Sequence, residues 1–465
     1  MVYLFIHRRS YHIKTLIDMN SDKPFTKFHK KNNYRIKKRD GGLPESRQKS
    51  TKQVKYQRKI LKIPSRLERL IEKYIENKTG KPVDTPATLE RIRQSILAQK
   101  AGYWSKTPHA KYGRGYDVFA YLAYQAPCYI IQFHYIIQRL DKSGVFPENI
   151  RVLDLGTGPG VVPLALTWFM KERKKGTLTI DAIEQSEEFI EAFKFLVPEF
   201  ASESPITTDL LQHADIRTWQ PQNSGTYTMI TCQNVLAELP GESSKEKADL
   251  LIKYCSSLTD DGILILVEPA ELRHSTELRI LQKNLEKSGL FLYGPCRYIH
   301  PGPCEPETCW SFAELSELKP PRLMELLSEG QDGYRFMNTD IKFSYSIFTK
   351  KPLAPVCPDS FIQGTIPLGE LEDYLGETVT IVGAKMSMDI GNREFAIFLI
   401  CDGSGGAKVY LIIPRSLKNE EIKSVKIADY GDILKISEVR VRWNPKKGSF
   451  NLVAGARTRV SAMHK

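Results

Sequence analysis

The sequence has few cysteines for its length and no long apolar run. Eight cysteines in 465 residues are too few for a disulfide framework, so the thiols are expected to stay reduced. No apolar run approaches the roughly 20 residues of a membrane-spanning helix, which predicts a protein without membrane partners. The first ten residues, "MVYLFIHRRS", lack the apolar core and the cleavage site of a secretory signal. These absences favour a cytoplasmic protein.

The N-terminal end leaves an alternative open. Residues 1–17 contain Arg8, Arg9 and Lys14 and no acidic residue, which also fits a weak organelle-targeting stretch and the mitochondrial matrix. The same segment could equally be an over-extended start, with Met19 as the true initiator. The sequence does not decide between these interpretations.

Positive charge is in excess, and it is clustered. The formal net charge is +13, and basic residues crowd the segment "KPFTKFHKKNNYRIKKRD", residues 23–40. Such a segment cannot bury enough apolar surface to fold alone, but it can neutralise phosphates, and its Phe25, Phe28 and Tyr34 can stack on bases. The clustering predicts an RNA partner. The alternative for residues 1–60 is a solvated, disordered basic tail.

The apolar pattern changes along the chain, which predicts an α/β protein of several parts. Helical spacing predicts a helical region over residues 61–145. Over 146–292, strands alternate with helices, which predicts a parallel sheet covered on both faces. Residues 293–352 hold a cysteine-rich segment and the last strands, and 353–374 are interpreted as a linker. Short strands with glycine turns over 375–465 predict a small closed barrel of about five strands.

The stretch "VLDLGTGPG" predicts a nucleotide-binding loop after the first strand of the sheet. Gly156, Gly158 and Gly160 let the backbone turn tightly and approach a ligand, and the helix that follows offers free N–H groups. Asp154 precedes the loop, where a carboxylate suits a cationic amino-acid group better than a phosphate. Glu184, at the end of the second strand, can accept hydrogen bonds from both hydroxyls of a ribose.

Together these features match the S-adenosylmethionine site of class I methyltransferases, with a plain strand-to-helix turn as the alternative. Asp215 in "LLQHADIRTW" is a candidate partner for the adenine amine. After the fourth strand, "CQNVLAELP" places Asn234 and Glu238 near the expected methyl group, without the Asn/Asp-Pro-Pro-aromatic motif of many base-nitrogen methyltransferases. Neither residue is an evident base, so the catalytic residues stay unassigned. Cofactor binding is better supported than methyl transfer.

Three of the cysteines fall in the segment "YGPCRYIHPGPCEPETCWSF", residues 293–312. Cys296, Cys304 and Cys309 stand among prolines that prevent a helix and stiffen the loop, so several thiols can face one centre. Thiolates select zinc or iron–sulfur clusters, and such centres normally need four ligands. The absence of paired C-x2-C knuckles favours a cluster over zinc; three unrelated loop thiols are the remaining alternative. The candidates for the fourth ligand are His300, Cys357 and Cys401.

Five stretches, in order across roughly residues 115–352, carry a likeness to a known family. They are "DVFAYLAYQAPCYIIQF", "VLDLGTGPG", "LILVEPAEL", "PCRYIHPGPCEPETCWSF" and "IKFSYSIFTKKP". The chain resembles the methyltransferase-like proteins of small-ribosomal-subunit assembly, which occur with mitochondrial ribosomes and in prokaryotes.

The resemblance implies a 4Fe–4S cluster held by the loop cysteines and one downstream cysteine close to an Asp-Gly. "FLICDGSGG" matches that pattern, so Cys401 is expected as the fourth ligand, with Cys357 as the runner-up. The resemblance also implies contact with small-subunit ribosomal RNA and ribosomal proteins, and a role in subunit maturation. A monomer is expected.

The last part of the chain looks like an oligonucleotide-binding (OB) barrel, which binds single strands through aromatic and basic side chains. The candidate residues are Arg440, Arg442, Trp443, Lys446 and Lys447. The alternative is a barrel that serves only as a packing lid.

Three functions are therefore weighed. The first is a subunit-assembly factor with a methyltransferase fold, S-adenosylmethionine and an iron–sulfur cluster. The second is an active methyltransferase on ribosomal RNA or a ribosomal protein, with a structural cluster or zinc. The third is a zinc-bound RNA-binding module with a vestigial cofactor site.

Overall fold

The computed structural model describes residues 61–103, 115–202, 204–221, 225–239, 241–330, 332–353 and 357–463. The basic segment within residues 1–60, and the RNA contact predicted for it, lie outside these described residues. None of the helices in the described ranges is both long enough and apolar enough to cross a bilayer.

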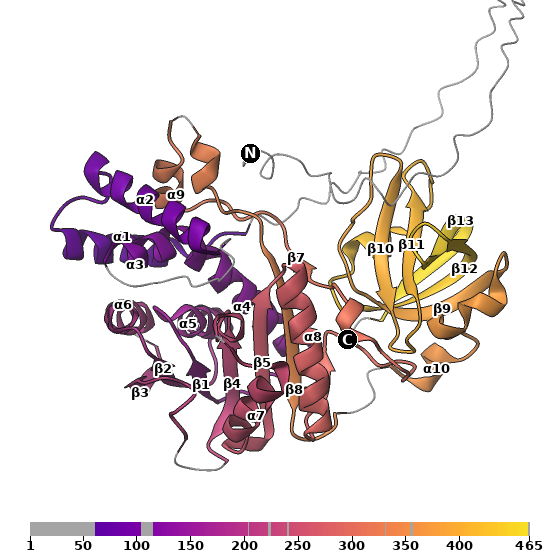
Figure 1. Cartoon of the computed structure of the whole chain (residues 1–465), viewed down its shortest axis with the longest axis horizontal. Helices are drawn as coiled ribbons and strands as arrows, with labels where there is room; N and C mark the ends of the chain where they lie inside the picture. The colour runs from indigo at the N-terminus through magenta and orange to yellow at the C-terminus, as the bar shows by residue number, and fades with distance from the viewer. Residues whose placement is uncertain are drawn as a thin grey trace, which may run out of the picture. The chain divides into compact units, whose positions relative to one another are not determined.

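One sheet organises the α/β part of the chain (Figure 1). Its strands are β1 (Ile150–Leu155), β2 (Leu178–Glu184), β3 (Ile206–His213), β4 (Tyr227–Gln233), β5 (Leu258–Pro269), β6 (Phe291–Gly294), β7 (Ala313–Glu314) and β8 (Lys342–Thr349). They lie in the order β3-β2-β1-β4-β5-β8-β6, and β7 pairs with β8. Strands β1 to β5 are parallel, whereas β8 is antiparallel to both β5 and β6. The strand order reverses between β1 and β4, and in such sheets ligands bind beyond the carboxyl ends of the strands at that point.

Alternate side chains of the central strands pack in two apolar cores, one on each face of the sheet. Val152 and Met229 pack in one core, and their neighbours Leu153 and Ile230 pack in the other. The covering helices are α5 (Val161–Arg173), α6 (Glu187–Ala201), α7 (Ser244–Cys255) and α8 (Leu272–Lys287). Successive side chains of a strand point to opposite faces, so near-continuous apolar strands bury both faces. The predicted Rossmann-like α/β fold, a mostly parallel sheet covered by helices on both faces, is confirmed.

The residues that precede the sheet form helices, and one of these helices contains a π-helical turn. The elements are α1 (Ser65–Thr79), α2 (Pro86–Tyr103), α3 (Tyr116–Ala120), the π turn η1 (Tyr121–Gln125) and α4 (Ala126–Lys142). Elements α3, η1 and α4 follow one another without a break, and they run along the first apolar core. Single π turns inside α-helices occur frequently at functional sites.

Five strands near the C-terminus close into a barrel, as predicted. They are β9 (Thr378–Lys385), β10 (Phe395–Cys401), β11 (Lys408–Pro414), β12 (Ile433–Asn444) and β13 (Ser449–Ala462), with the short helix α11 (Lys423–Ile427) between β11 and β12. Around the barrel the order is β10-β11-β13-β12-β9, and β9 pairs with β10 to close it. Strands β11 and β13 are parallel, and the other neighbours are antiparallel.

The segment 353–374, interpreted from the sequence as a linker, contains structure. It holds α10 (Asp359–Ile362) and the 3-10 helix η5 (Leu368–Tyr374). Leu368 and Leu371 are buried in the core of the barrel, and the Leu368 N–H donates to the Asp402 carboxylate over 2.7 Å. The proline-rich composition indicated a connector, but these two leucines complete the barrel core. The remaining short elements are η2 (Leu236–Glu238), η3 (Pro306–Thr308), α9 (Arg322–Leu327) and η4 (Gly333–Phe336).

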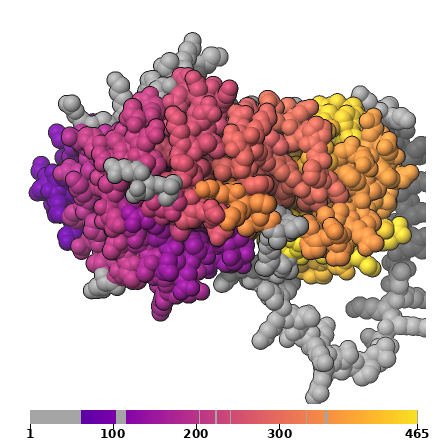
Figure 2. Space-filling view, turned by 90° about the horizontal axis from the view of Figure 1, so that it is seen from below, coloured from indigo at the N-terminus to yellow at the C-terminus, as the bar shows by residue number. Residues whose placement is uncertain are grey.

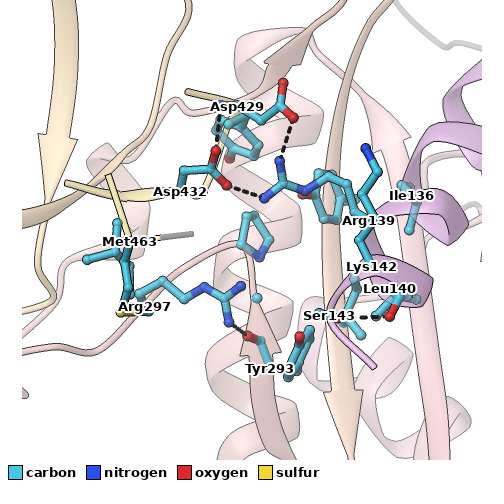
Figure 3. A pocket seen from close by; sticks show the side chains of 17 residues that line it. Ile136, Arg139, Leu140, Lys142, Ser143, Tyr293, Arg297, Asp429, Asp432 and Met463 are labelled. Atoms are coloured by element: carbon cyan, nitrogen blue, oxygen red, sulfur yellow. Dashed lines mark hydrogen bonds and ion pairs between the residues drawn. The ribbon is translucent and has the colours of Figure 1, made fainter. Parts of the chain in front are cut away.

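An arginine on α4 pairs with two carboxylates of the loop that precedes β12 (Figure 3). The Arg139 guanidinium lies 3.1 Å from Asp429 and 2.7 Å from Asp432, beside a cavity of about 200 Å³ between the sheet part and the barrel. In the space-filling view, the surface coloured for residues near 300 adjoins that of the barrel (Figure 2). The barrel is thus packed against the sheet part through polar as well as apolar contacts.

Replacing Arg139 with methionine is expected to lower the free energy of unfolding by on the order of 2 kcal/mol, because two carboxylates then lose their cation. Urea unfolding followed by circular dichroism measures this. Arg273→Ala is the control, since Arg273 pairs with Glu277 on an exposed helix face, where an ion pair contributes below about 1 kcal/mol. Equal effects of the two substitutions would contradict the role given to Arg139.

Candidate functional site

The loop after β1 has the geometry of a ligand-binding turn. Gly156, Gly158 and Gly160 have φ angles of 67°, 56° and 93°, which favour glycine. A Cβ on Gly156 would lie 2.6 Å from a methyl group of Val235, so the loops after β1 and β4 are in close contact. A Cβ on Gly158 would meet nothing within 4 Å, and its backbone therefore stays open to a ligand.

Asp154 lies at the carboxyl end of β1, buried at the bottom of this turn. Its Oδ1 accepts a hydrogen bond of 2.6 Å from the Thr231 hydroxyl on the neighbouring strand β4. Burial, as the largest cause, raises the pKa of Asp154 to about 6. A cationic ligand beside this buried carboxyl would bind favourably, because the cation stabilises the ionised form that burial disfavours.

Glu184, the last residue of β2, ties two loops together. Its carboxylate accepts the N–H of Gly158 at 2.8 Å and the N–H groups of Gln185 and Ser186 at 2.9 and 2.8 Å. Burial raises its pKa, against those hydrogen bonds. The structure therefore brings the predicted Glu184 directly to the glycine loop, near enough to Asp154 for its charge to affect the pKa of Asp154.

Two further predicted residues follow β3 and β4. Asp215 lies just past β3, and both of its carboxylate oxygens lie 3.0 Å from Nε of Arg217, which holds its pKa below the usual range. Asn234 follows β4 with φ 57°. Neither side-chain atom of Asn234 has a hydrogen-bond partner among the residues that the structure describes. Asn234 thus brings two buried polar atoms to the loop that touches Gly156, where a ligand could satisfy them.

Two further side chains near the carboxyl ends of β1 and β4 were not predicted from the sequence. Tyr121, in the π turn, is close enough to Glu238, Glu184 and Asp154 for their charges to add to the burial that raises its pKa. Gln233 donates from Nε2 to the Tyr129 carbonyl at 3.1 Å, while its Oε1 has no partner in the described part of the chain. Tyr121 and Tyr129 both stand in the quoted stretch "DVFAYLAYQAPCYIIQF". An apolar helical pattern, however, does not show which face of the helix lies against the ends of the strands.

Glu268 was also missed, although it stands in the quoted stretch "LILVEPAEL". Its buried carboxylate accepts the N–H groups of Leu236 at 3.0 Å and Ala237 at 3.3 Å. Burial raises its pKa to about 7. Glu268 therefore fixes the loop after β4, and with it the position of Asn234.

The cysteine loop is seated on the turn between β10 and β11. The His300 N–H donates to the Asp402 carbonyl at 3.0 Å. A Cβ on Gly302 would lie 2.1 Å from the carbonyl oxygen of Ser404, and a Cβ on Gly405 would lie 2.6 Å from that of Pro303. These backbone approaches leave no room for side chains, so the loop and the turn are fitted to each other. Because that turn directly follows Cys401, at the end of β10, the contact places Cys401 near the cysteine loop.

The four predicted metal ligands lie in one neighbourhood. Burial and then charge on Cys296 and Cys309 raise the pKa of the Cys401 thiol. Burial and the charges of the same two cysteines raise the pKa of Cys304 to about 11. Such mutual effects require the groups to be near one another. Cys401 as a whole residue is exposed, although the groups packed around its thiol disfavour the charged form; the three loop cysteines are partly buried.

The thiols are neighbours rather than an assembled metal site. Within the described ranges, no three His, Cys, Asp or Glu side chains are arranged to hold a metal ion. The donor type is the one that soft metals prefer, because the four residues are all cysteines, carried by the loop and by a strand end. The charged neighbours of Cys357 are Lys435 and Asp359, not the loop cysteines, which favours Cys401 as the fourth member.

The predicted RNA-binding side chains lie on one strand of the barrel and the turn after it. Arg440 and Arg442 are both exposed and, two residues apart on β12, point to the same side. Trp443 is 44% exposed, and its ring packs edge-on against Phe450 with 4.8 Å between ring centres. Lys446 and Lys447 follow in the turn that leads into β13.

Comparisons with known proteins bear on parts of the chain. Residues 369–463 match the family described as "Domain of unknown function (DUF8157) C-terminal domain". That range covers the barrel and most of η5, and the description of the family names no function. The comparison with curated proteins found no match to this chain.

The solved structures that are similar to this chain include several methyltransferases. Magnesium protoporphyrin IX methyltransferase from Synechocystis PCC 6803, with bound S-adenosylmethionine, is 15% identical, with a TM-score of 0.30, over 57% of this chain and 97% of that one. A SAM-dependent methyltransferase from Leishmania major is 13% identical, with a TM-score of 0.29, over 60% and 90%. A third, from Aquifex aeolicus, is 18% identical, with a TM-score of 0.28, over 37% and 87%. The fold assignment rests on the order and direction of this chain's own strands, and the resemblance to small-subunit assembly proteins stays a prediction.

Proposed function

We propose that this chain binds S-adenosylmethionine in the crevice at β1 and β4, holds an iron–sulfur cluster between the cysteine loop and the barrel, and works on small-subunit ribosomal RNA as an assembly factor. The observation that carries the proposal is the seating of the cysteine loop on the turn that follows Cys401, through the His300 N–H to Asp402 carbonyl hydrogen bond and the close backbone approaches at Gly302 and Gly405.

The crevice supports S-adenosylmethionine through the distribution of its charges. Asp154 would attract the cationic amino-acid part, Gly158 would let the ligand approach the backbone, and Glu184 would accept hydrogen bonds from the ribose. Asp215 would accept a hydrogen bond from the adenine amine, and its pairing with Arg217, which lowers its pKa, favours the ionised form.

The cluster would be held by Cys296, Cys304, Cys309 and Cys401. Bound there, a 4Fe–4S cluster would supply a redox-active cross-link between the loop and the barrel. The chain's own part is to present the sulfurs: prolines stiffen the loop, and the tight contacts at Gly302 and Gly405 press it against the turn after β10.

Anaerobic purification followed by iron, sulfide and zinc assays tests the cluster. The proposal predicts about four irons and four sulfides per chain and a brown protein with broad absorbance near roughly 400 nm. Zinc without iron would instead support a zinc-bound RNA-binding module.

The barrel supports RNA binding because its topology agrees with an OB fold: five strands, closed, with β11 parallel to β13. Arg440 and Arg442 supply exposed cations on one side of β12, and the neighbouring Trp443, 44% exposed near the end of the strand, supplies a ring that could stack on a base. These are the groups that hold single strands with little sequence preference.

The triple substitution Arg440→Ala, Arg442→Ala, Trp443→Ala is expected to weaken binding of a single-stranded ribosomal RNA fragment at least tenfold. Lost stacking alone costs about 1–3 kcal/mol per base. The salt dependence should flatten by about 0.7 in log–log slope per lost phosphate contact. Fluorescence anisotropy over a range of salt measures both, with Lys423→Ala on α11 as the control. If the triple variant binds like the control, the barrel is only a packing lid.

A second candidate function is active methyl transfer. It is favoured by the unpartnered side-chain atoms of Asn234 and by Oε1 of Gln233, which lie buried beside the glycine turn. Radiolabelled methyl transfer to small-subunit RNA or protein tests it. Incorporation that disappears in Asp154→Asn would establish an enzyme; no incorporation with intact cofactor binding would leave the assembly factor.

A further inference from the structure

The cavity of about 200 Å³ between the sheet part and the barrel has no role in the proposed function. Its walls come chiefly from the end of α4, from β6 and the residues after it, from β8 and from the loop before β12. Apolar and aromatic side chains make up much of the lining, among them Ile136, Leu140, Tyr345, Ile347 and Tyr430. Such hollows are typical of small-molecule sites, and those for drug-sized ligands measure roughly 300–1,000 Å³. The cavity therefore suits a smaller ligand.

The charged groups on one side of the cavity balance one another. Arg139 lies 3.1 Å from the Asp429 carboxylate and 2.7 Å from that of Asp432. The buried Lys385 of β9 lies near the same two carboxylates: burial lowers its pKa, and the charges of Asp429 and Asp432 oppose that shift. Two cations thus neutralise two carboxylates, and this group adds no net charge to the cavity.

Two further cations line the cavity, Lys142 at the end of α4 and Arg297 after β6. Neither takes part in an ion pair within the described part of the chain. Figure 3 shows Arg297 and the carboxylates that bind Arg139 on different sides of the cavity. Positive charge is therefore in excess, and a cavity with low-dielectric walls concentrates such a field and attracts anions.

Arg297 is held in a fixed position with one donor unsatisfied. Its Nη1 donates to the Tyr293 carbonyl, and its guanidinium carbon lies 5.0 Å from the centre of the Tyr293 ring. A Cβ on Gly294 would lie 3.4 Å from that carbon, so the guanidinium rests on the glycine backbone. The Nε is buried and has no hydrogen-bond partner among the described residues. Nε and Nη2 form the edge with which arginine binds two oxygens of one anion, and a buried donor without an acceptor is costly.

We infer that this cavity binds a small phosphate monoester, with the phosphate oxygens on Arg297 and the organic part against the apolar lining. A phosphate monoester carries about −1.5 to −2 charges at neutral pH, which matches the two uncompensated cations better than one carboxylate does. Tyr345 would add a neutral donor: burial raises the pKa of its hydroxyl, and the charges of Arg139 and Arg297 oppose that shift. Lys142 adds to the positive field of the cavity.

Isothermal titration calorimetry on the full-length protein tests the inference, with glycerol 3-phosphate as the probe and with dimethyl phosphate and glycerol as comparison ligands. We expect glycerol 3-phosphate to bind with a Kd below about 1 mM, and at least tenfold more tightly than the singly charged diester. Glycerol without phosphate should not bind. Arg297→Gln is expected to weaken the binding of glycerol 3-phosphate by about tenfold or more, because it removes the charge-assisted contact.

A second variant keeps the test valid should Arg297→Gln fail to fold. Lys142→Glu reverses a charge at an exposed position, so the fold should be preserved, and it is expected to weaken binding by about tenfold. Lys194→Glu makes the same change at an exposed position of α6, a helix that contributes no residue to the cavity lining, and is the matched control. The triple substitution on β12 should also bind like the wild type, which separates this site from the proposed RNA surface.

Weaker binding in both cavity variants, with wild-type affinity in Lys194→Glu and in the triple variant, supports the inference. Unchanged binding in both cavity variants would overturn it. So would equal affinities for glycerol 3-phosphate and dimethyl phosphate, or no binding of glycerol 3-phosphate below about 10 mM. None of these results depends on S-adenosylmethionine or iron, because none of the residues proposed to hold either group lines the cavity.

Discussion

Cys401→Ser is expected to lose most of its iron and to unfold at a markedly lower urea concentration than the wild type. A serine hydroxyl is a poor ligand for a soft centre, and without the fourth sulfur the loop and the barrel are no longer cross-linked. A cross-link that closes a loop of roughly 100 residues contributes on the order of 4 kcal/mol. Iron assays and urea unfolding on anaerobically purified protein measure the two effects.

Cys357→Ser is the matched control for that experiment. Cys357 is buried in a small apolar cluster with Val382 and Ile433, and the loop cysteines do not contribute to its electrostatic surroundings. It is expected to keep its iron and to lose only the small stability of a buried thiol. Iron lost in Cys357→Ser but kept in Cys401→Ser would show that the other candidate is the ligand.

The affinity for S-adenosylmethionine is expected to fall as the pH drops below about 6. Burial raises the pKa of Asp154 to about 6, so below this pH the free protein carries a neutral carboxyl at the bottom of the glycine turn. The cationic amino-acid group needs the ionised form. Each pH unit below the pKa should therefore weaken binding by up to about tenfold. Calorimetric titration between pH 5 and 8 measures this.

Asp154→Asn should remove both the affinity and its dependence on pH. Folding should survive, because the raised pKa means that burial disfavours the ionised Asp154; its stabilising contribution is present below pH 4 and is lost as the pH rises through about 6. At pH 8 the asparagine variant is thus expected to be at least as stable as the wild type. Asp209→Asn, at an exposed pair with Arg151, controls for the loss of a charge. An unchanged pH profile in Asp154→Asn would show that another group binds the cation.

The sheet and its glycine turn could be predicted from the sequence because their signals are local. Apolar runs predict the strands, and the ends of these strands carry Asp154, the three loop glycines and Glu184. Parallel strands bring such ends to one edge of the sheet. The barrel was predictable in the same way, from short strands separated by glycines. The segment 353–374 was not, since Leu368 and Leu371 join the barrel core only through contacts that are distant in the sequence.

The hydrogen-bond partners of a buried side chain could not be predicted from the sequence, for the same reason. Nothing around Arg279 in the sequence indicates that hydroxyls of Ser344 and Tyr430, 65 and 151 positions away, surround it. The π turn that brings Tyr121 to the crevice is likewise hidden, because an apolar helical pattern looks the same with or without one extra residue in a turn. These contacts arise from tertiary packing, which spacing along the chain does not encode.

The most direct measurement is a crystal structure of the anaerobically purified protein, with anomalous scattering recorded at the iron edge. We predict a compact iron peak enclosed by the sulfurs of Cys296, Cys304, Cys309 and Cys401. Iron-free density with these sulfurs turned away from one another would contradict it.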